Sequence, residues 1–332
     1  MDGKRININD VAKELGMSKS TVSRAISGKG RISEQTRVRV MDYINQIGYV
    51  PNNLAKSLAQ SRTNNIACVI PKEDRFAQLP FFQKFIWGIN NSAVNNDYDV
   101  LTVIATKDDI SQLERVIKNQ KVDGVILARL YENDMALQFL KENEIPFVAI
   151  GTVDDSNVVQ IDNDNMGGCR ELTSDLLNKG YERIAYIGNN ELSTVNNQRL
   201  MGYVQAFLDA DVDCPTQYIS LMDNVIKAVD TAVEKFIEEG VDCIVCMDDA
   251  ICADVLEIVE QRGLSIPKDI SVASLYDSSV LERNRPGVTT LSFDAEQLGE
   301  KGCQILIDEI NGKNSQQKYL QDYSVVWKGS TR

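Results

Sequence analysis

From Asn64 onward, short apolar segments alternate with amphipathic stretches along almost the whole chain. Each apolar segment is long enough for a buried strand, and each stretch between two of them has the spacing of a helix with one apolar face. Alternation of this kind predicts parallel sheets covered by helices on both faces. We expect strands at 66–71, 99–105, 122–128, 145–151, 183–188, 243–247 and 270–275, and helices near 81–95, 110–119, 134–142, 165–179, 197–210, 226–239 and 251–261.

The alternating segments come in two successive sets, so we expect two doubly wound α/β subdomains with a cleft between them. In open parallel sheets, ligands bind beyond the carboxyl ends of the strands. The residues that follow the predicted strands are therefore candidates for a binding site. They are Pro71, 128–130, Gly151, 188–190, Asp248–Asp249 and Tyr276–Asp277.

Charge is distributed unevenly over the 332 residues. The first 62 residues hold 11 Lys and Arg against 5 Asp and Glu, which leaves 24 basic and 43 acidic residues, a balance of −19, for the rest. A basic N-terminal module can neutralise phosphates while an acidic body stays away from nucleic acid. The N-terminal segment is therefore the candidate DNA-binding part of the chain.

The segment SKSTVSRAI at 18–26 predicts the second helix of a helix-turn-helix, with Ser18 as its N-cap. An upstream helix capped by Asn7 would end at Gly16, where a left-handed residue is needed. Val22 would hold the second helix against the first. The alternative is an ordinary helical hairpin whose second helix is simply solvated.

A third helix is expected between Ser33, as its cap, and Gly48. An asparagine at 52 or 53 then has the position to cap one further short helix, on which Leu58 would be exposed. Because a helix of that length is unstable alone in water, we expect a hinge that orders only with support. The alternative is a plain linker, with Leu58 covered by the body.

Catalytic and metal-binding chemistry is disfavoured. The chain contains no histidine, which excludes Ser-His-Asp and Cys-His schemes and most zinc sites. Asp248–Asp249 and the pair Asp162 and Asp164 have no nucleophile beside them, and IDNDN is interpreted as the start of a helix. Cys243 and Cys246 would point to opposite faces of one strand, so buried thiols are favoured over zinc. We expect no enzyme, no metal and no cofactor.

No apolar run approaches the roughly 20 residues that a membrane span requires. The N-terminus MDGKRININD does not resemble a signal peptide, and the seven cysteines form no repeating framework. We therefore expect a cytoplasmic, nucleoid-associated protein with reduced thiols and no membrane partner.

Over almost its whole length the chain resembles the lactose-repressor (LacI/GalR) family of bacterial transcription regulators. The N-terminal resemblance, to the headpiece and hinge, covers NINDVAKELGMSKSTVSRAISGKGRISEQTRVRVMDYINQIGYVPNNLAKSLA. The body is similar in IDNDNMGG, GYERIAYIG, RLMGY, MDDAICADVL and TTLSFDAEQLGEKG. IDNDN and RLMGY together are most similar to the maltose-operon repressors of Gram-positive bacteria.

The resemblance implies a helix-turn-helix headpiece, a hinge helix and a periplasmic-binding-protein-like body that binds an effector and dimerises. The headpiece would span 1–51, the hinge 52–63 and the body 64–332. The body's N-subdomain would comprise about 64–162 with 294–317, and its C-subdomain about 163–293 with 318–332.

For DNA recognition, Lys19 and Ser20 match the family's main base-reading positions. Leu58 matches the residue wedged between the central base pairs, and insertion between base pairs would explain why an exposed position holds a leucine. Ala55 lies where the paired hinges of the family approach closely. The DNA-binding residues implied in this way are Asn7, Lys19, Ser20, Thr21, Ser23, Arg24, Asn52, Ala55 and Leu58.

For effector recognition, Arg199 matches the family's most dependable contact, and its guanidinium suits vicinal hydroxyls or a carboxylate. Asp248 and Asp277 match polar contact positions, and Phe293 is expected to stack on a pyranose ring. Asp248 stands where asparagine is common in the family, and Ala128 where some sugar-binding members have a polar residue. The effector therefore cannot be copied from any one relative.

We therefore expect a homodimeric regulator, a repressor of a carbohydrate-utilisation operon, that binds near-palindromic double-stranded operator DNA. Its effector would be a sugar such as maltose or a maltodextrin, and a phosphorylated carrier protein is an open further partner. One alternative is a regulator of the same family that responds to a nucleobase or a sugar phosphate. The others are a sugar-binding protein or enzyme on this fold, against which the basic headpiece argues, and an architectural DNA protein, which leaves the ligand-binding body unexplained.

Overall fold

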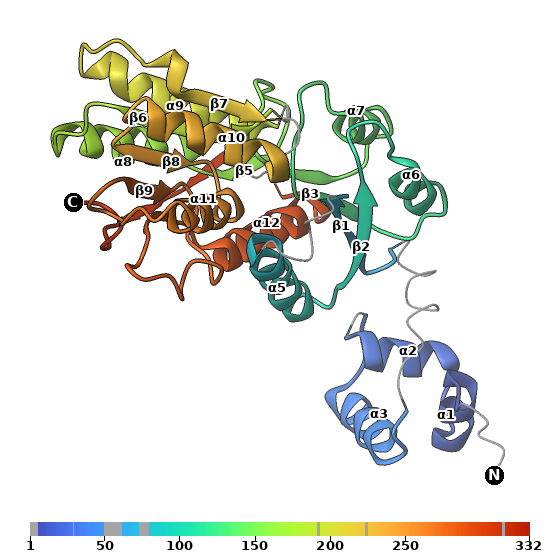
Figure 1. Cartoon of the computed structure of the whole chain (residues 1–332). Coiled ribbons are helices and arrows are strands. Elements are labelled where there is room, and N and C mark those ends of the chain that lie inside the picture. The colour runs from blue at the N-terminus through green and yellow to red at the C-terminus, as the bar shows by residue number, and fades with distance from the viewer. Residues whose placement is uncertain are drawn as a thin grey trace. The chain divides into compact units, whose positions relative to one another are not determined.

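The computed structural model describes residues 6–28, 30–49, 62–72, 80–190, 193–222, 225–313 and 316–332. The chain divides into two compact units, 1–63 and 64–332, which are described separately below (Figure 1). Among the helices of these described ranges, none combines the length and the apolar character of a membrane span.

The N-terminal unit contains three helices, α1 (Ile8–Leu15), α2 (Lys19–Ser27) and α3 (Glu34–Gln46). Their core is small, and each helix contributes a fully buried valine: Val11, Val22 and Val40. Because the core is small, the hydrogen-bonded caps at the helix starts, each typically worth about 1 kcal/mol, matter to this unit.

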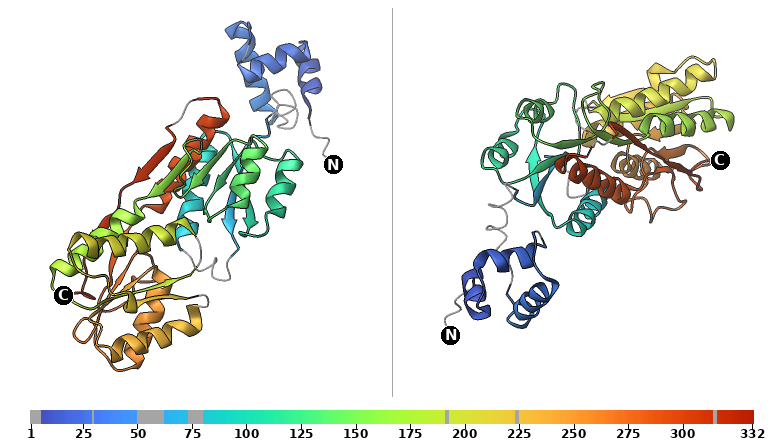
Figure 2. Two further views of the ribbon diagram at one scale, coloured as in Figure 1. Left: turned by 90° about the horizontal axis from the view of Figure 1, so that it is seen from above. Right: turned by 180° about the vertical axis from the view of Figure 1, so that it is seen from behind.

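The body contains two six-stranded sheets (Figures 1 and 2). The first has the order β11-β5-β4-β3-β1-β2, and all its strand pairs are parallel. Helices α5 and α12 pack on one face, and α6 and α7 on the other. Its elements are β1 (Asn65–Pro71), α5 (Pro80–Asn95), β2 (Asp99–Ala105), α6 (Ser111–Lys118), β3 (Gly124–Leu127), α7 (Met135–Glu142), β4 (Phe147–Ile150), β5 (Gln160–Asn163), α12 (Ala295–Ile310) and β11 (Lys318–Gln321).

The second sheet has the order β12-β10-β9-β8-β6-β7, with β12 antiparallel to β10 and the other pairs parallel. Helices α8 and α9 pack together, as do α10 and α11. The elements are α8 (Asn165–Asn178), β6 (Ile184–Asn189), α9 (Thr194–Asp209), a 3-10 turn (Thr216–Tyr218), β7 (Ile219–Met222), α10 (Val225–Glu238), β8 (Cys243–Cys246), α11 (Asp249–Gln261), β9 (Ser271–Ser274), β10 (Thr289–Ser292) and β12 (Ser324–Val326).

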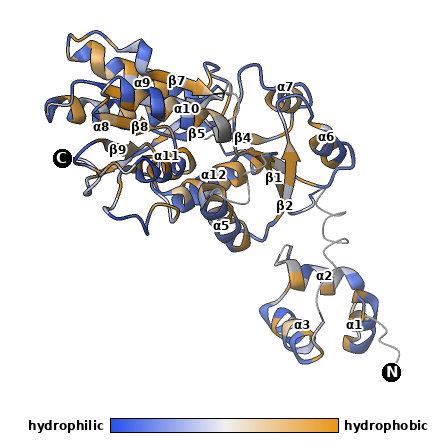
Figure 3. Ribbon diagram, in the orientation of Figure 1, coloured by the Kyte–Doolittle hydropathy of each residue, from blue (hydrophilic) through white to orange (hydrophobic). Residues whose placement is uncertain are grey.

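The predicted α/β architecture with two parallel sheets is confirmed, and each strand and helix predicted within the described residues is present with its ends within three residues. The predicted hinge helix lies outside the described residues. Apolar and polar residues alternate around the helices, as expected for helices that cover a sheet with one face (Figure 3).

Two short strands, β11 and β5, were not expected from the sequence. The chain returns to the second sheet after Gln321 and not at 318, because KYLQ adds a parallel edge strand to the first sheet, with Tyr319 paired to Ile161. Residues 161–163 of IDNDN form strand β5, and only Asp164 caps the following helix, where its Oδ1 accepts from Gly167 N at 2.8 Å. Both strands are too short and too polar for a periodicity argument to find them.

Helices α5 and α12 cross at very short range because glycines lie at the contact. A Cβ atom on Gly88 would lie 1.9 Å from the carbonyl oxygen of Glu296, and one on Gly299 would lie 2.1 Å from that of Phe85. The backbones touch directly, so neither position has room for a side chain. This contact anchors α12 on the first sheet after the chain has returned from the second.

Candidate DNA-binding surface and effector site

The first two helices are joined by a tight turn. Asn7 begins α1 with a reciprocal capping box, in which its side chain accepts from Asp10 N at 3.4 Å and the Asp10 carboxylate accepts from Asn7 N at 2.9 Å. Gly16 ends α1 with φ of 65°, and Ser18 then caps α2 by accepting from Thr21 N at 3.1 Å. The turn therefore sets the direction of α2 through hydrogen bonds of local residues.

Helix α2 has one core-facing side and one solvent-facing side. Val22 and Ala25 are buried. The predicted DNA-reading residues lie on the other side: Lys19, Ser20, Ser23 and Arg24 are exposed, and Thr21 is half-buried. The first turn contains no acidic residue. The positive end of the helix dipole is therefore not offset within that turn, which suits a phosphate group.

The hydroxyl groups at the start of α2 contact one another. Ser18 Oγ lies 2.8 Å from Ser20 Oγ and 2.8 Å from Thr21 Oγ1. Ser20 and Thr21 therefore support the cap, whereas Lys19 carries the positive charge of this turn. The predicted hinge residues Asn52, Ala55 and Leu58 lie outside the described residues.

In the body, Arg199 of α9 is half-buried at the junction of three segments. Its Nη1 donates to the carbonyl oxygen of Met247, just after β8, at 2.9 Å. Its Nε donates to Oδ1 of Asn165, at the start of α8, at 3.2 Å. The guanidinium thus lies at the carboxyl end of a central strand of the second sheet, where ligands of such sheets bind.

Asp162 belongs to the same cluster and was not predicted as a site residue. Its side chain is only 5% exposed. It accepts from Asn163 N at 2.8 Å, from Asn165 Nδ2 at 3.2 Å and from Thr152 Oγ1 at 3.4 Å. Burial raises the pKa of this carboxyl to about 6, against the opposing effect of these hydrogen bonds and of the Arg199 charge. The sequence argument interpreted IDNDN only as the start of a helix and so missed that Asp162 lies on the strand that precedes it.

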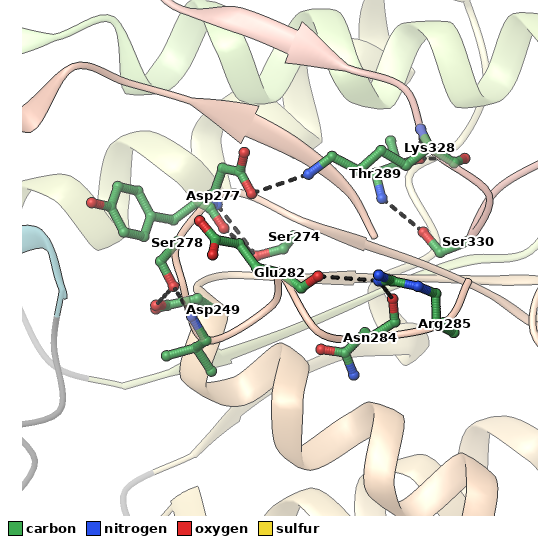
Figure 4. Close-up of polar contacts among 12 residues, drawn as sticks. Asp249, Ser274, Asp277, Ser278, Glu282, Asn284, Arg285, Thr289, Lys328 and Ser330 are labelled. Carbon is green, nitrogen blue, oxygen red and sulfur yellow. Dashed lines mark hydrogen bonds and ion pairs between the residues drawn. The ribbon is translucent and has the colours of Figure 1, made fainter. Parts of the chain in front are cut away.

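The other three predicted effector residues lie in different surroundings. Asp248 follows Met247 and caps α11, with its Oδ1 accepting from Ile251 N at 2.8 Å. Asp277 pairs with Lys328, whose Nζ lies 3.3 Å from Oδ1 (Figure 4). Phe293 is 8% exposed, and its ring packs edge-on against Tyr323 at 6.4 Å. The structure thus groups Arg199 with Asp248 and gives Asp277 and Phe293 protein partners.

Polar contacts also support the loop that carries Asp277. Ser278 donates to the buried carboxylate of Asp249, and Ser274 Oγ donates to the carbonyl oxygen of Tyr276 at 2.8 Å (Figure 4). Burial is the main cause of the raised pKa of the Asp249 carboxyl. Asp249 is therefore a structural support for this loop, which agrees with the interpretation that Asp248–Asp249 is not a catalytic pair.

Segments 130–132 and 193–197 meet across the boundary between the two subdomains, and we call this contact the clasp. Tyr131 and Ser193 form an antiparallel β-bridge, and Thr194 N donates to the carbonyl oxygen of Leu130 at 3.2 Å. Asn197 Nδ2 donates to Oε1 of Glu132 at 2.7 Å. None of these long-range pairings could be read from the sequence, because each joins residues about sixty positions apart.

An aromatic contact also joins the subdomains. Phe81, at the start of α5, lies edge-on to Tyr276, which follows β9, with ring centroids 5.9 Å apart. Phe81 also stacks on Phe85 at 5.8 Å. An aromatic surface therefore exists beside the effector residues, although it is not formed by Phe293.

The cysteines are structural. All seven are free thiols, and all but Cys214, which is half-buried, are buried. Burial raises the pKa of Cys68 and Cys169 to about 12, so these thiols stay protonated and unreactive. Within the described ranges, no group of three His, Cys, Asp or Glu residues is placed to hold a metal ion.

Two family models match the chain. Residues 7–52 match "Bacterial regulatory proteins, lacI family", and residues 173–331 match "Periplasmic binding protein-like domain". The HTH-type transcriptional regulator CelR of Thermobifida fusca is 29% identical over 323 residues, 94% of either chain. The regulator MalR of Streptococcus pneumoniae (strain ATCC BAA-334 / TIGR4) is 28% identical over 337 residues, 97% of this chain and 99% of its own.

Solved structures agree with these matches. A transcriptional regulator CelR–cellobiose complex is 27% identical with a TM-score of 0.73, covering 98% of this chain and 100% of its own. A lac repressor dimer bound to operator and the anti-inducer ONPF has a TM-score of 0.83 at 21% identity, covers 99% of both chains and shows a shared fold.

CelR and MalR match to nearly the same degree, so the finer resemblance to maltose-operon repressors is not established. The coarser assignment stands on the headpiece match, the body match and the full-length relatives together. Proteins of this kind bind DNA and are not enzymes. The chain is a LacI-family transcription regulator, with a helix-turn-helix headpiece and an effector-binding body.

Proposed function

We propose that the protein represses a carbohydrate-utilisation operon and that an uncharged sugar controls its affinity for operator DNA. The observation that carries this proposal is the position of Arg199, held by Met247 and Asn165 where the carboxyl end of β8 meets the start of α8. A rigid fork of donors in this place suits the vicinal hydroxyls of a sugar.

The charges around Arg199 favour a neutral effector over an anionic one. Asp162 interacts electrostatically with Arg199, and Asp248 follows the residue that Arg199 contacts. Carboxylates accept from sugar hydroxyls but repel a phosphate dianion. A sugar is therefore favoured over the sugar phosphate of the alternative hypothesis. The relative solved with cellobiose supports the same class of ligand, and maltose and maltodextrins remain the first candidates.

The effector would act by changing the relative arrangement of the two body subdomains. Two protein contacts already join the subdomains: the clasp and the contact of Phe81 with Tyr276. A sugar that contacts both subdomains binds the closed arrangement more tightly and increases its population. In the proposed mechanism this change reaches the dimer interface and the paired hinges, and thereby alters operator affinity.

The DNA-bound form would be a homodimer that places two copies of α2 in successive major grooves of a near-palindromic site. Helix α5 supplies an apolar surface for a second copy. Trp87 and Val94, seven residues apart and therefore on one face, are 53% and 70% exposed. The lac repressor structure, a dimer bound to operator, shares this fold.

The test is a titration of the full chain on the promoter DNA of its own operon, by fluorescence anisotropy, at a fixed salt concentration. The panel contains maltose, maltotriose, cellobiose, lactose, their monosaccharides, glucose 6-phosphate, and free purines. We expect an uncharged sugar to change the affinity at least about tenfold, which is about 1.4 kcal/mol of coupling. A response confined to purines or to the sugar phosphate would contradict the proposal.

A further inference from the structure

A small recess opens on the C-subdomain at the carboxyl ends of β6 and β7. The first turns of α9 close its other side. The described residues that line it are amides, one tyrosine and two leucines, with no charged side chain among them: Tyr186, Asn189, Asn190, Asn196, Asn197, Leu200 and Leu221.

Tyr186 is the exceptional residue of this recess. Its side chain is fully buried, and its hydroxyl has no hydrogen-bond partner among the residues that the structure describes. Two other buried tyrosines of the same subdomain are paired: the Tyr203 hydroxyl donates to the carbonyl oxygen of Ile184 at 2.8 Å, and the Tyr181 hydroxyl lies 2.8 Å from Ser271 Oγ. A buried hydroxyl without a partner lowers stability. The residue that carries this one lines the recess, which makes the recess a candidate place for a ligand that supplies the missing partner.

The backbone next to Tyr186 accommodates its ring. A Cβ atom on Gly188 would lie 2.9 Å from Cε1 of the Tyr186 ring. Residues 186 and 188 point to the same face of β6, so the missing side chain lets the ring lie along the strand, toward its carboxyl end. Tyr203 holds the ring from the helix side, with centroids 5.3 Å apart.

The recess adjoins the proposed effector site. The charges of Arg199 and Asp248 both act on the Tyr186 hydroxyl. Burial raises the pKa of this hydroxyl far above its ordinary value, so it stays protonated and able to donate. Asn197, in the recess lining, is the residue that donates to Glu132 of the other subdomain. The recess therefore opens where the two subdomains meet.

The amides of the recess are held in place. Asn196 Nδ2 donates to Oδ1 of Asn189 at 2.5 Å, which fixes both side chains on the wall. The recess has room for a water molecule or a hydroxymethyl group. Leu200 and Leu221 add apolar surface, against which the carbon of a hydroxymethyl group can pack.

We propose that this recess, with Tyr186 in its wall, binds one hydroxyl or hydroxymethyl group of an uncharged polyhydroxy effector whose ring lies in the cleft beside Arg199. The recess thereby selects among sugars, because a ligand without that group leaves the buried hydroxyl unpaired. An ionised group would enter a site whose described lining contains no opposite charge, at a high desolvation cost. The inference rests on the proposed sugar response and specifies its selectivity.

The decisive variant is Tyr186→Phe, which removes a single oxygen atom. Because that hydroxyl has no protein partner among the described residues, the unliganded variant should unfold at the same temperature as the wild type or above it. Calorimetric titration of the full chain with the sugars of the promoter panel should show affinity reduced about three- to tenfold. The matched control is Tyr203→Phe, which loses a protein hydrogen bond, so its unfolding temperature should fall while its sugar affinity is retained.

A series of monodeoxy derivatives of the sugar that binds best locates the group. One deoxy position should weaken binding to the wild type and have no further effect on Tyr186→Phe. If sugars bind and Tyr186→Phe keeps wild-type affinity for all of them, the recess has no role in recognition and this inference fails, while the proposed function stands. If no uncharged sugar of the panel binds the wild type, both are overturned.

Discussion

Asn197 on α9 donates a hydrogen bond of 2.7 Å to Glu132, which follows β3 in the opposite subdomain. Together with the bridge between Tyr131 and Ser193, it closes one side of the boundary between the subdomains. The proposed effector residue Arg199 lies only two positions further along α9. In the proposed mechanism, sugar binding and subdomain closure therefore act on the same helix turn.

Replacing Glu132 by alanine should weaken sugar binding, because the proposed closed arrangement loses the acceptor of the Asn197 hydrogen bond between the subdomains. Glu132 is at the protein surface, where such bonds contribute modestly, so we expect a two- to fivefold loss, or about 0.5–1 kcal/mol. Calorimetric titration with the sugar measures this loss of affinity. Glu142→Ala, which removes the same charge from the end of α7, serves as control and should bind like the wild type. Equal affinities for the two variants would show that the clasp does not contribute to closure.

Arg199→Ala should abolish the effector response and leave operator binding intact, because the guanidinium lies in the body at the proposed effector site. Arg199→Lys should fail in the same way. A lysine ammonium is a point charge and cannot donate from a planar fork to both Met247 and Asn165 while it also reaches a ligand. Anisotropy titrations on promoter DNA, with and without sugar, give both quantities. Loss of DNA binding or of folding in these variants would contradict the assignment of Arg199 to the effector site.

Strong periodicity made most of the fold predictable. Segments such as 66–71 and 99–105 are long and apolar enough to be recognised as buried strands, and the structure places them as β1 and β2. The headpiece was equally predictable from the sequence, because Asn7, Gly16 and Ser18 act through hydrogen bonds within a few residues. Local chemistry of this kind is written in the sequence itself.

The rest depended on contacts that no local pattern encodes. Strand β11 is four residues long and half polar, and only its pairing with β5 identifies it. Tyr186 reads as one more apolar strand residue, and its unpaired hydroxyl becomes visible only when its neighbours are placed. Phe293 is aromatic and near the predicted site, yet Tyr323 covers it from a segment thirty residues away. Its role in sugar stacking stays a prediction.

Gly88→Ala should destabilise the body strongly. The added methyl group would lie 1.9 Å from the carbonyl oxygen of Glu296, so α5 and α12 must move apart. Overpacking typically costs about 1–3 kcal/mol, and a clash with backbone lies at the upper end of that range, above the gain of about 1 kcal/mol for replacing glycine in a helix. Urea unfolding should show a net loss, whereas Gln83→Ala, on the exposed side of α5, should stay within about 0.5 kcal/mol of the wild type. A neutral Gly88→Ala would mean that the two helices are not packed this closely.

Lys19→Ala should reduce binding to promoter DNA more than binding to random DNA of equal length. Lys19 lies exposed in the first turn of α2, where the resemblance to the family places base contacts. We expect a specific loss of about 1–3 kcal/mol. Lys13→Ala removes the same charge from the exposed side of α1 and should not change the ratio of specific to non-specific affinity. If Lys19→Ala loses the same affinity for promoter DNA and for random DNA, Lys19 contacts phosphate and does not read a base.

Asp162 should make stability depend on pH in the direction opposite to an ordinary salt-bridged carboxylate. Its pKa is raised from 3.8 to about 6 in the folded protein, so the folded state holds the proton more tightly than the unfolded chain does. The stabilisation is complete below about pH 4 and is lost as the pH rises to about 6. The shift corresponds to roughly 3 kcal/mol.

The measurement compares urea unfolding of the wild type and Asp162→Asn from pH 4 to pH 8. Because the amide of the variant does not titrate, the difference between the two free energies of unfolding isolates Asp162 from the other carboxyls, such as the buried Asp249. The wild type should lose up to about 3 kcal/mol relative to the variant between pH 4 and pH 6, and the difference should stay constant above pH 7. A difference that does not change with pH would mean that Asp162 is ionised at its ordinary pKa. In that case the polar cluster around Arg199 would be open to water rather than closed by the two subdomains.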